Sequence, residues 1–128
     1  MEDKRKFRRG EASFAIRYQV RSPVEVRLEF GVKEQEAIAC DLSEGGLALF
    51  LEHPLPAGAV IDLSFRLFNQ GAAVEAERAR KFALQAETRY SQRMPDKSYR
   101  VGVRFLNTSS TDREFIASVL RSLRAGSA

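Results

Sequence analysis

Apolar residues recur at every second position over most of this 128-residue chain. A period of two places successive side chains on opposite faces of an extended backbone, so the pattern predicts half-buried β-strands. Turn signals separate the segments, for example at residues 54–58 and 94–97. Many short strands favour a closed barrel or a sandwich, because closure removes exposed strand edges. The alternating segments are residues 14–20, 24–30, 38–42, 47–51, 59–67, 82–90 and 99–105.

The period changes near the C-terminus, where apolar residues fall on one helical face. Thr111 and Glu114 have the spacing of a capping box, and Gly126 is a typical residue after a helix end. We therefore predict a helix over about residues 110–124 that plugs or leans on the barrel. Residues 72–81 give conflicting signals, since their alanines and glutamates favour a helix while their neighbours favour strands. The apolar face of the helix comprises Phe115, Ile116, Val119, Leu120 and Leu123.

Length and composition indicate one globular domain. A chain of 128 residues is long enough for one core, and 44% hydrophobic with 30% charged residues is a globular composition. The formal net charge is +4, but residues 1–10 alone carry a net +3. The positive charge is therefore concentrated at the N-terminus and is not spread over the surface.

Several features bound the cellular context and the chemistry. Cys40 is the single cysteine, so an internal disulfide is impossible, and its place in an apolar segment predicts a buried, unreactive thiol. The N-terminus lacks the apolar core of a signal peptide, and the apolar run 47–51 is too short to span a bilayer. We expect a cytoplasmic protein.

Catalytic motifs are poorly represented. The single histidine, His53, precedes Pro54 in a predicted surface turn. A histidine–cysteine catalytic pair or a histidine-rich metal site is therefore disfavoured. The sequence has neither a Walker loop nor a Gly-x-Gly-x-x-Gly motif. We expect neither enzymatic activity nor a metal or cofactor.

Two short motifs have the chemistry to hold phosphates and bases. In Arg5–Arg9 two arginines stand four residues apart, and each guanidinium presents a rigid fork of donors. The segment Asp41–Gly46 has the pattern Asp-x-Ser-x-x-Gly, which supplies a carboxylate, a hydroxyl and a permissive glycine. Taken singly, the first motif is also typical of a solvated tail and the second of an ordinary turn.

In this order and separation, the two motifs resemble those of the PilZ domain family, whose members bind bacterial cyclic di-GMP. Residues 101–105 and the terminal helix extend the likeness, which runs from about Lys4 to Leu123. It implies an antiparallel β-barrel of about six or seven strands with a C-terminal helix, and divides the chain into a basic arm, residues 1–11, and a barrel domain, residues 12–128. The ligand residues it implies are Arg5, Arg9, Asp41, Ser43 and Gly46, with Lys4 and Arg8 as secondary candidates.

The resemblance implies a signalling receptor or adaptor whose ligand is cyclic di-GMP and whose downstream partner is a protein still to be identified. Like charge and little apolar surface predict that the arm is mobile when empty and becomes ordered on ligand binding. Phe7 is interpreted as an anchor for the arm, with base stacking as the alternative. One alternative function is a PilZ-like interaction module without nucleotide binding. Another, a nucleic-acid binder, is disfavoured because basic residues do not line a groove.

Overall fold

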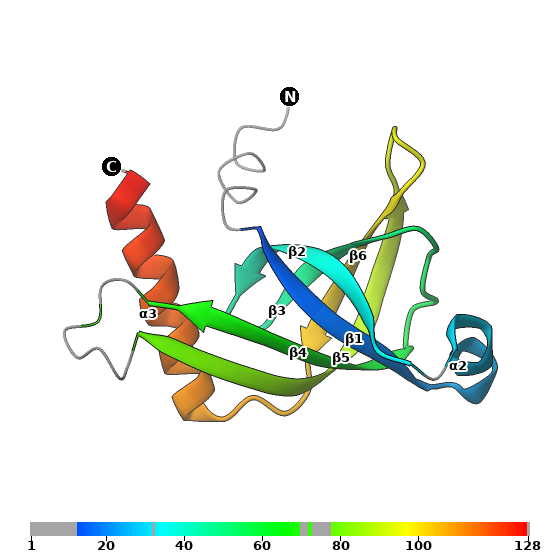
Figure 1. Cartoon of the computed structure of the whole chain (residues 1–128), viewed down its shortest axis with the longest axis horizontal. Coiled ribbons are helices and arrows are strands. Elements are labelled where there is room, and N and C mark those ends of the chain that lie inside the picture. Colours follow the sequence, from blue (N-terminus) through cyan, green and yellow to red (C-terminus); the bar gives the residue numbers. More distant parts are fainter. Residues whose placement is uncertain (1–12, 32, 70–71, 73–77, 128) are drawn as a thin grey trace.

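The structure is a computed structural model of the chain; it describes residues 13–31, 33–69, 72 and 78–127, with side chains described as far as Leu123. Over these residues six antiparallel strands close into a barrel in the order β1-β2-β3-β6-β5-β4 (Figure 1). The predicted barrel with a C-terminal helix is confirmed. The strands are β1 (Phe14–Ser22), β2 (Gln35–Ser43), β3 (Gly46–Leu51), β4 (Val60–Phe68), β5 (Ala79–Arg93) and β6 (Tyr99–Phe105).

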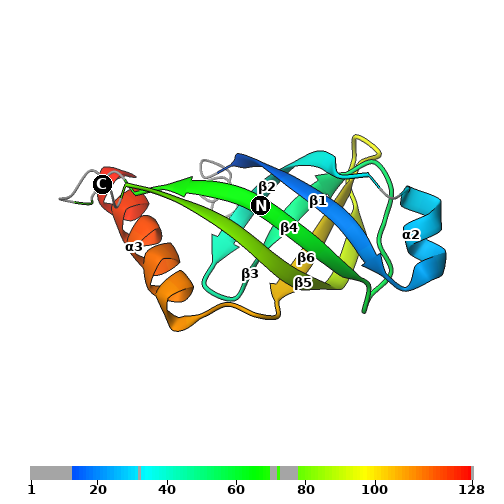
Figure 2. The same ribbon diagram turned by 60° about the horizontal axis from the view of Figure 1, so that its bottom comes forward.

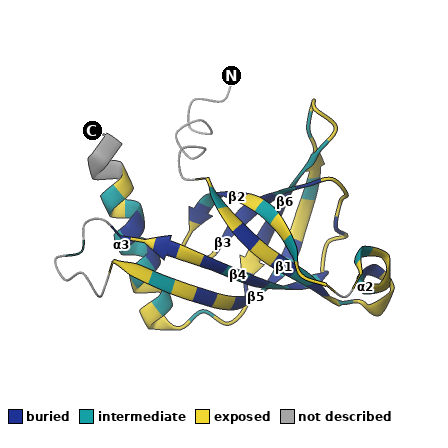
Figure 3. Ribbon diagram, in the orientation of Figure 1, coloured by how far each residue is buried: buried dark blue, intermediate teal, exposed yellow. Residues whose placement is uncertain are grey.

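The alternating residues of the strands build the core of the barrel. Buried positions alternate with more exposed ones along β4 and along β5 as far as Thr88, as Figure 3 shows. The alternation predicted through residue 90 is wrong at its end, because β5 shifts register between Thr88 and Tyr90 and Tyr90 is exposed. The ring of Phe65 stacks on that of Phe82 with 5.1 Å between centroids, and lies 6.3 Å from that of Phe105. Three strands thus contribute aromatic rings to one cluster inside the barrel. Side chains of this size bury large apolar areas, so the cluster is a major source of stability.

Residues 24–30 form a helix, α2 (Val24–Phe30), and the prediction of a strand there is wrong. The alternating residues do not share a buried face: Val26 is buried, whereas Val24 and Leu28 are 59% and 72% exposed. Val26 and Phe30, four residues apart on one helical face, both pack on the core. Gly31 ends the helix with φ +89°, a conformation that favours glycine, and donates to the Arg27 carbonyl at 2.9 Å.

Tertiary pairing explains why a sheet pattern forms a helix here. Strand β1 already pairs with β2 on one side and with β4 on the other, so the barrel closes without a further strand. The alternating residues that follow β1 are left outside the sheet, at the end of the barrel away from α3 (Ser110–Ser127) (Figure 1, Figure 2). His53 is exposed, as expected for a turn, and its ring lies 6.1 Å from that of Phe30.

Helix α3 leans on the opposite end of the barrel, beside the ends of β4 and β5 (Figure 1, Figure 2). Ile116 and Val119 are 0% and 4% exposed and join the core, and Phe115 lies 5.9 Å from the ring of Phe82. These contacts use the predicted apolar face. Leu123 is 43% exposed, so the last turn of that face contributes less.

The ends of α3 differ from the prediction. The capping residue is Ser109, whose hydroxyl accepts from the Asp112 amide at 3.0 Å, while the Asp112 carboxylate accepts from the Ser109 amide at 3.3 Å. This reciprocal pair is the capping box, so its assignment to Thr111 and Glu114 is wrong by two residues. The helix also continues through Gly126. Of the unassigned stretch 72–81, residues 79–81 belong to β5 and residues 73–77 lie outside the described part of the chain.

Candidate functional site

Asp41 occupies a bulge near the end of β2. Ala39 and Leu42 both belong to the core although they are three residues apart, so the strand contains one extra residue and the period of two predicted for residues 38–42 is broken. The pairing with β3 shifts register between Cys40 and Ser43, and Asp41 has φ +53°. Aspartate tolerates this left-handed conformation better than most residues. Cys40 is buried, as predicted.

The Asp41 carboxylate is held by Arg100 of β6. Arg100 alternates with the buried Val101, so its side chain lies outside the barrel and reaches over β3 to donate from Nη2 to Asp41 Oδ2. The Asp41 and Arg100 side chains are only 8% and 13% exposed. This is a well-buried ion pair that links two strands separated by β3.

Tyr90 of β5 completes a row of three polar side chains on the outer surface. Arg100 donates from Nη1 to the Tyr90 hydroxyl, and the guanidinium carbon lies 5.8 Å from the centroid of the Tyr90 ring. Burial alone lowers the pKa of Arg100, but the hydrogen bond to Asp41 and the neighbouring Tyr90 and Asp41 raise it, and the net shift is upward. Arg100 is therefore a permanent cation fixed between a carboxylate and a phenol.

A small residue on β6 makes room for this row. A Cβ placed on Gly102 would lie 2.2 Å from an edge carbon of the Tyr90 ring, so the ring rests directly on the backbone of β6. Gly102 is opposite Tyr90 in the β5–β6 ladder and opposite Ala48 in the β3–β6 ladder. The floor under Arg100 and Tyr90 is therefore made of the smallest side chains, which leaves the aromatic ring and the guanidinium close to the strands.

Ser43 and Gly46 shape the turn that joins β2 to β3. The Ser43 hydroxyl donates to the Gly46 carbonyl and accepts from the Gly45 amide, both at 3.3 Å. A Cβ on Gly46 would lie 2.1 Å from the carbonyl oxygen of Val103, so only glycine fits there. The predicted hairpin position of the motif is confirmed, and the structure gives each of its three residues a contact within the fold.

The basic motif lies outside the described residues, and with it Arg5 and Arg9 and the secondary candidates, Lys4 and Arg8. The strand register nevertheless fixes where the arm joins the barrel. Phe14, at the start of β1, is paired with Ala39, two residues before Asp41. Paired strands lie about 4.8 Å apart and an extended chain covers about 3.3 Å per residue, so an arginine five residues before Phe14 has the reach to meet Asp41.

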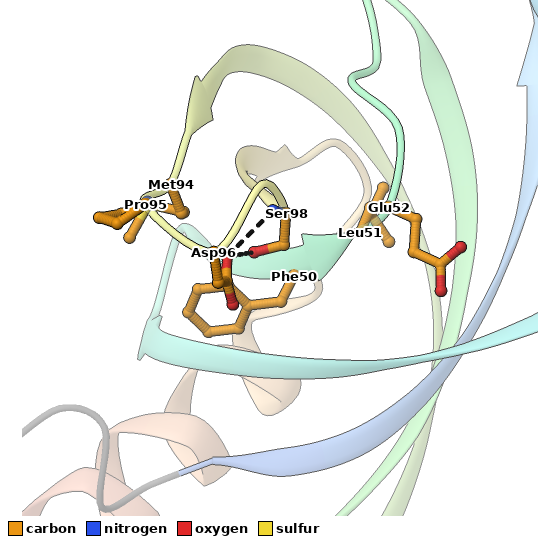
Figure 4. Close-up of a pocket in the computed structure, with 7 residues that line it drawn as sticks. All are labelled: Phe50, Leu51, Glu52, Met94, Pro95, Asp96 and Ser98. Atoms are coloured by element: carbon orange, nitrogen blue, oxygen red, sulfur yellow. Dashed lines mark hydrogen bonds between the residues drawn. The ribbon is translucent and has the colours of Figure 1, made fainter.

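A hollow of about 390 Å³ lies on the same outer surface but holds none of the predicted site residues. Its Phe50 is paired with Arg100 in the β3–β6 ladder, so the hollow adjoins the polar row. At its rim Asp96 accepts from the Ser98 hydroxyl at 2.6 Å and from the Ser98 amide at 2.9 Å (Figure 4). These bonds lower the pKa of Asp96. The hollow is lined by Phe50, Leu51, Glu52, Met94, Pro95, Asp96 and Ser98.

Among residues 13–31, 33–69, 72 and 78–127, no three or more histidine, cysteine or acidic side chains are grouped so that they could hold a metal ion. None of the helices in the described part of the chain has both the length and the apolar character needed to cross a membrane.

Sequence reasoning missed Arg100 and Tyr90. Along β6 successive side chains point to opposite faces, so the sequence could predict that Arg100 lies on the outer face when Val101 faces the core. Its partner could not be predicted, because Asp41 is 59 positions away and the pairing depends on the strand order β2-β3-β6.

Comparison with known proteins assigns the chain to a family. The PilZ domain family matches residues 3–122, so the chain belongs to this family. A search of curated proteins found no match.

Three solved structures share the fold. Bacillus subtilis MotI/DgrA, an inhibitor of motility, is 17% identical with a TM-score of 0.56 over 88% of this chain and 47% of its own. MrkH of K. pneumonia in its apo state is 14% identical with a TM-score of 0.56 over 89% and 48%. The PilZ domain of YcgR from Escherichia coli with c-di-GMP is 18% identical with a TM-score of 0.50 over 90% and 92%. The chain spans about half the length of the first two proteins.

The two adjacent glycines of the turn give a matched test of its packing. Gly46→Ala forces a methyl group against the backbone of β6, where overpacking costs about 1–3 kcal/mol of the free energy of unfolding. A Cβ on Gly45 would have no atom within 4 Å, so Gly45→Ala should change the free energy of unfolding by only a few tenths of the change caused by Gly46→Ala. Urea denaturation of both variants measures the difference. Equal stability of the two variants would show that the backbones of β3 and β6 are farther apart at Gly46 than in the structure.

Proposed function

We propose that the chain is a receptor for cyclic di-GMP that acts as a signalling adaptor in the bacterial cytoplasm. The observation that carries the proposal is the strand register, which joins the basic arm to the barrel beside the acidic turn. Family membership over residues 3–122 includes both motifs. From this register we infer that the two motifs, about thirty residues apart in the chain, act on one ligand.

The proposed binding residues have complementary chemistry. Arg5 and Arg9 supply forked cationic donors for phosphate oxygens and for the O6 and N7 acceptors of guanine. Asp41 supplies an acceptor for the N–H groups of the guanine edge. Ser43 and Gly46 hold the turn that presents Asp41, and their polar groups line the same wall.

The secondary candidates, Lys4 and Arg8, add charge to the arm. Lys4 directly precedes the first motif arginine, where a further cation would help to hold a second nucleotide. We propose that the chain is divided into an arm, residues 1–11, and a barrel domain, residues 12–128.

The proposed signal is a change in the arm. An anion with two phosphates neutralises the repulsion among the basic residues and gives Arg5 and Arg9 fixed partners, which favours an ordered arm over the outer surface of β2 and β3. A partner protein then meets a different surface in the bound state. The identity of that partner is a matter for capture experiments with the loaded protein.

One observation favours the alternative of an interaction module without nucleotide binding. Asp41, Ser43 and Gly46 each make a contact that the fold itself uses, so the motif has a structural purpose even in an empty domain. The two functions differ in the arm: a module without nucleotide binding has no need of Arg5 and Arg9, whereas a receptor does.

Base selectivity tests the proposal. We expect cyclic di-GMP to bind about 5- to 160-fold more tightly than cyclic di-AMP, because a well-placed set of guanine contacts is worth about 1–3 kcal/mol of discrimination. Competition binding at two salt concentrations is the measurement. Affinity for cyclic di-GMP at a site with a few arginines should fall only modestly as salt rises, whereas the affinity of a general polyanion-binding surface falls steeply. Equal competition by cyclic di-AMP would exclude specific guanine recognition.

A further inference from the structure

The row Asp41–Arg100–Tyr90 is more elaborate than the turn requires. The Ser43 hydroxyl makes two hydrogen bonds within the β2–β3 connection, and the backbones of Ser43 and Gly46 are paired there. Arg100 instead approaches Asp41 from a strand that is not its neighbour, and Tyr90 approaches Arg100 from a third strand. Gly102 has no side chain, and a Cβ there would collide with the Tyr90 ring. Three strands thus combine to fix the direction of a single carboxylate.

Stability does not by itself account for such an arrangement. A buried ion pair must offset the desolvation of both charges, and replacing it by apolar residues is often neutral or stabilising. A carboxylate that reads a base has different requirements. It must point in one direction, since a rotated carboxylate loses the geometry of its hydrogen bonds. A guanidinium fixed at hydrogen-bond distance sets the direction of the carboxylate.

We propose that Arg100 is a positioning residue of the guanine site: it holds the Asp41 carboxylate aimed at the guanine edge, and Tyr90 holds Arg100 in place. The inference rests on the proposed function and adds two residues that lie outside both motifs. A carboxylate has acceptor sites for several donors, so Asp41 can receive Arg100 on one oxygen and still accept from a guanine N–H.

The inference predicts a loss of selectivity, not merely of affinity. The inosine analogue of cyclic di-GMP lacks the exocyclic amine of guanine and so lacks one donor to Asp41. For the native chain we expect cyclic di-GMP to bind about 10- to 100-fold more tightly than this analogue, as for loss of a hydrogen bond to a charged group. In Arg100→Ala the ratio should fall toward one, because the carboxylate is no longer aimed. A purely structural role of Arg100 would weaken both ligands equally.

Matched variants complete the experiment, which uses calorimetry on the full chain. Tyr90→Phe keeps the ring and removes the hydroxyl, so it should lower the ratio by a smaller factor; it also serves if Arg100→Ala fails to fold. Arg80→Ala is the control, because Arg80 also pairs with a carboxylate, Asp112 at 3.0 Å, and lies over a ring, Phe82 at 5.7 Å. Arg80 is far from the polar row, because it lies twelve positions along β5 from Gln92, the residue that is paired with Arg100. The ratio of the two affinities in Arg80→Ala should equal the ratio in the native chain.

The outcomes separate the inference from the proposed function. A native ratio in a folded Arg100→Ala variant overturns the positioning role and leaves the receptor standing. A native chain that binds both ligands equally also overturns it, because Asp41 then does not read the amine. A native chain that binds neither ligand overturns the receptor and the inference together.

Discussion

Replacing Arg9 with alanine is expected to weaken binding of cyclic di-GMP by about 30- to 1000-fold, and replacing Arg5 should have an effect of similar size. The range corresponds to about 2–4 kcal/mol for loss of a charge-assisted contact to a phosphate or a guanine edge. Both arginines precede β1 in the sequence, and the first residue of β1, Phe14, is paired with Ala39, two residues before Asp41. Calorimetric titration of each variant gives the change in dissociation constant.

Arg17→Ala is the control for this pair. Arg17 lies on the exposed face of β1 and contacts Glu36 at 3.4 Å, so its loss removes one positive charge without touching the proposed site. It should leave affinity within about a factor of two, since exposed ion pairs contribute little. Equal affinity in all three variants would remove the arm from the binding site. If the arm becomes ordered on binding, saturating ligand should also slow trypsin cleavage after its basic residues in the native chain.

Replacing Asp41 with alanine is expected to destabilise the free domain by about 3–5 kcal/mol, because it leaves the buried guanidinium of Arg100 without its carboxylate. For a domain of this size the melting temperature should fall by about 10 °C or more. Alanine also tolerates the positive φ of Asp41 less well than aspartate, which adds to the loss. Thermal unfolding followed by circular dichroism measures the effect.

A second ion pair provides the comparison. Arg21 and Asp62 are bound at 3.1 Å but are 56% and 36% exposed, so Asp62→Ala should cost less than about 1 kcal/mol. The double variant Asp41→Asn with Arg100→Met removes both charges and should recover much of the stability while remaining unable to bind ligand. A single Asp41→Ala variant as stable as Asp62→Ala would contradict the buried pair. A double variant that binds cyclic di-GMP fully would remove Asp41 from the ligand site.

The sequence predicted most of the barrel because the strands obey a local rule. Residues that alternate along β4 and along β5 as far as Thr88 face the core and the solvent in turn, and no tertiary information is needed to see this. The rule failed at residues 24–30, where Val26 and Phe30 pack in a helix. Their alternation is the same as in a strand, and only the closure of the barrel by β1 and β4 leaves them without a partner strand.

The candidate site was predictable in part for the same reason. The motif Asp41–Gly46 is local, so its place at a hairpin could be predicted from turn chemistry. The bulge at Asp41 could not, since it shows in the burial of both Ala39 and Leu42 and in the register shift against β3. The contact with Arg100 is set by strand order across β3, which no spacing in the sequence encodes.

Calorimetric titration of the full chain with cyclic di-GMP, beside a variant with both Arg5→Ala and Arg9→Ala, measures whether the chain binds the nucleotide through the two motif arginines. We expect saturable binding to the native chain at micromolar or lower concentrations, and loss of that binding in a variant whose barrel remains folded. Absence of saturable binding to the folded native chain, or identical titrations of the two proteins, would contradict this expectation.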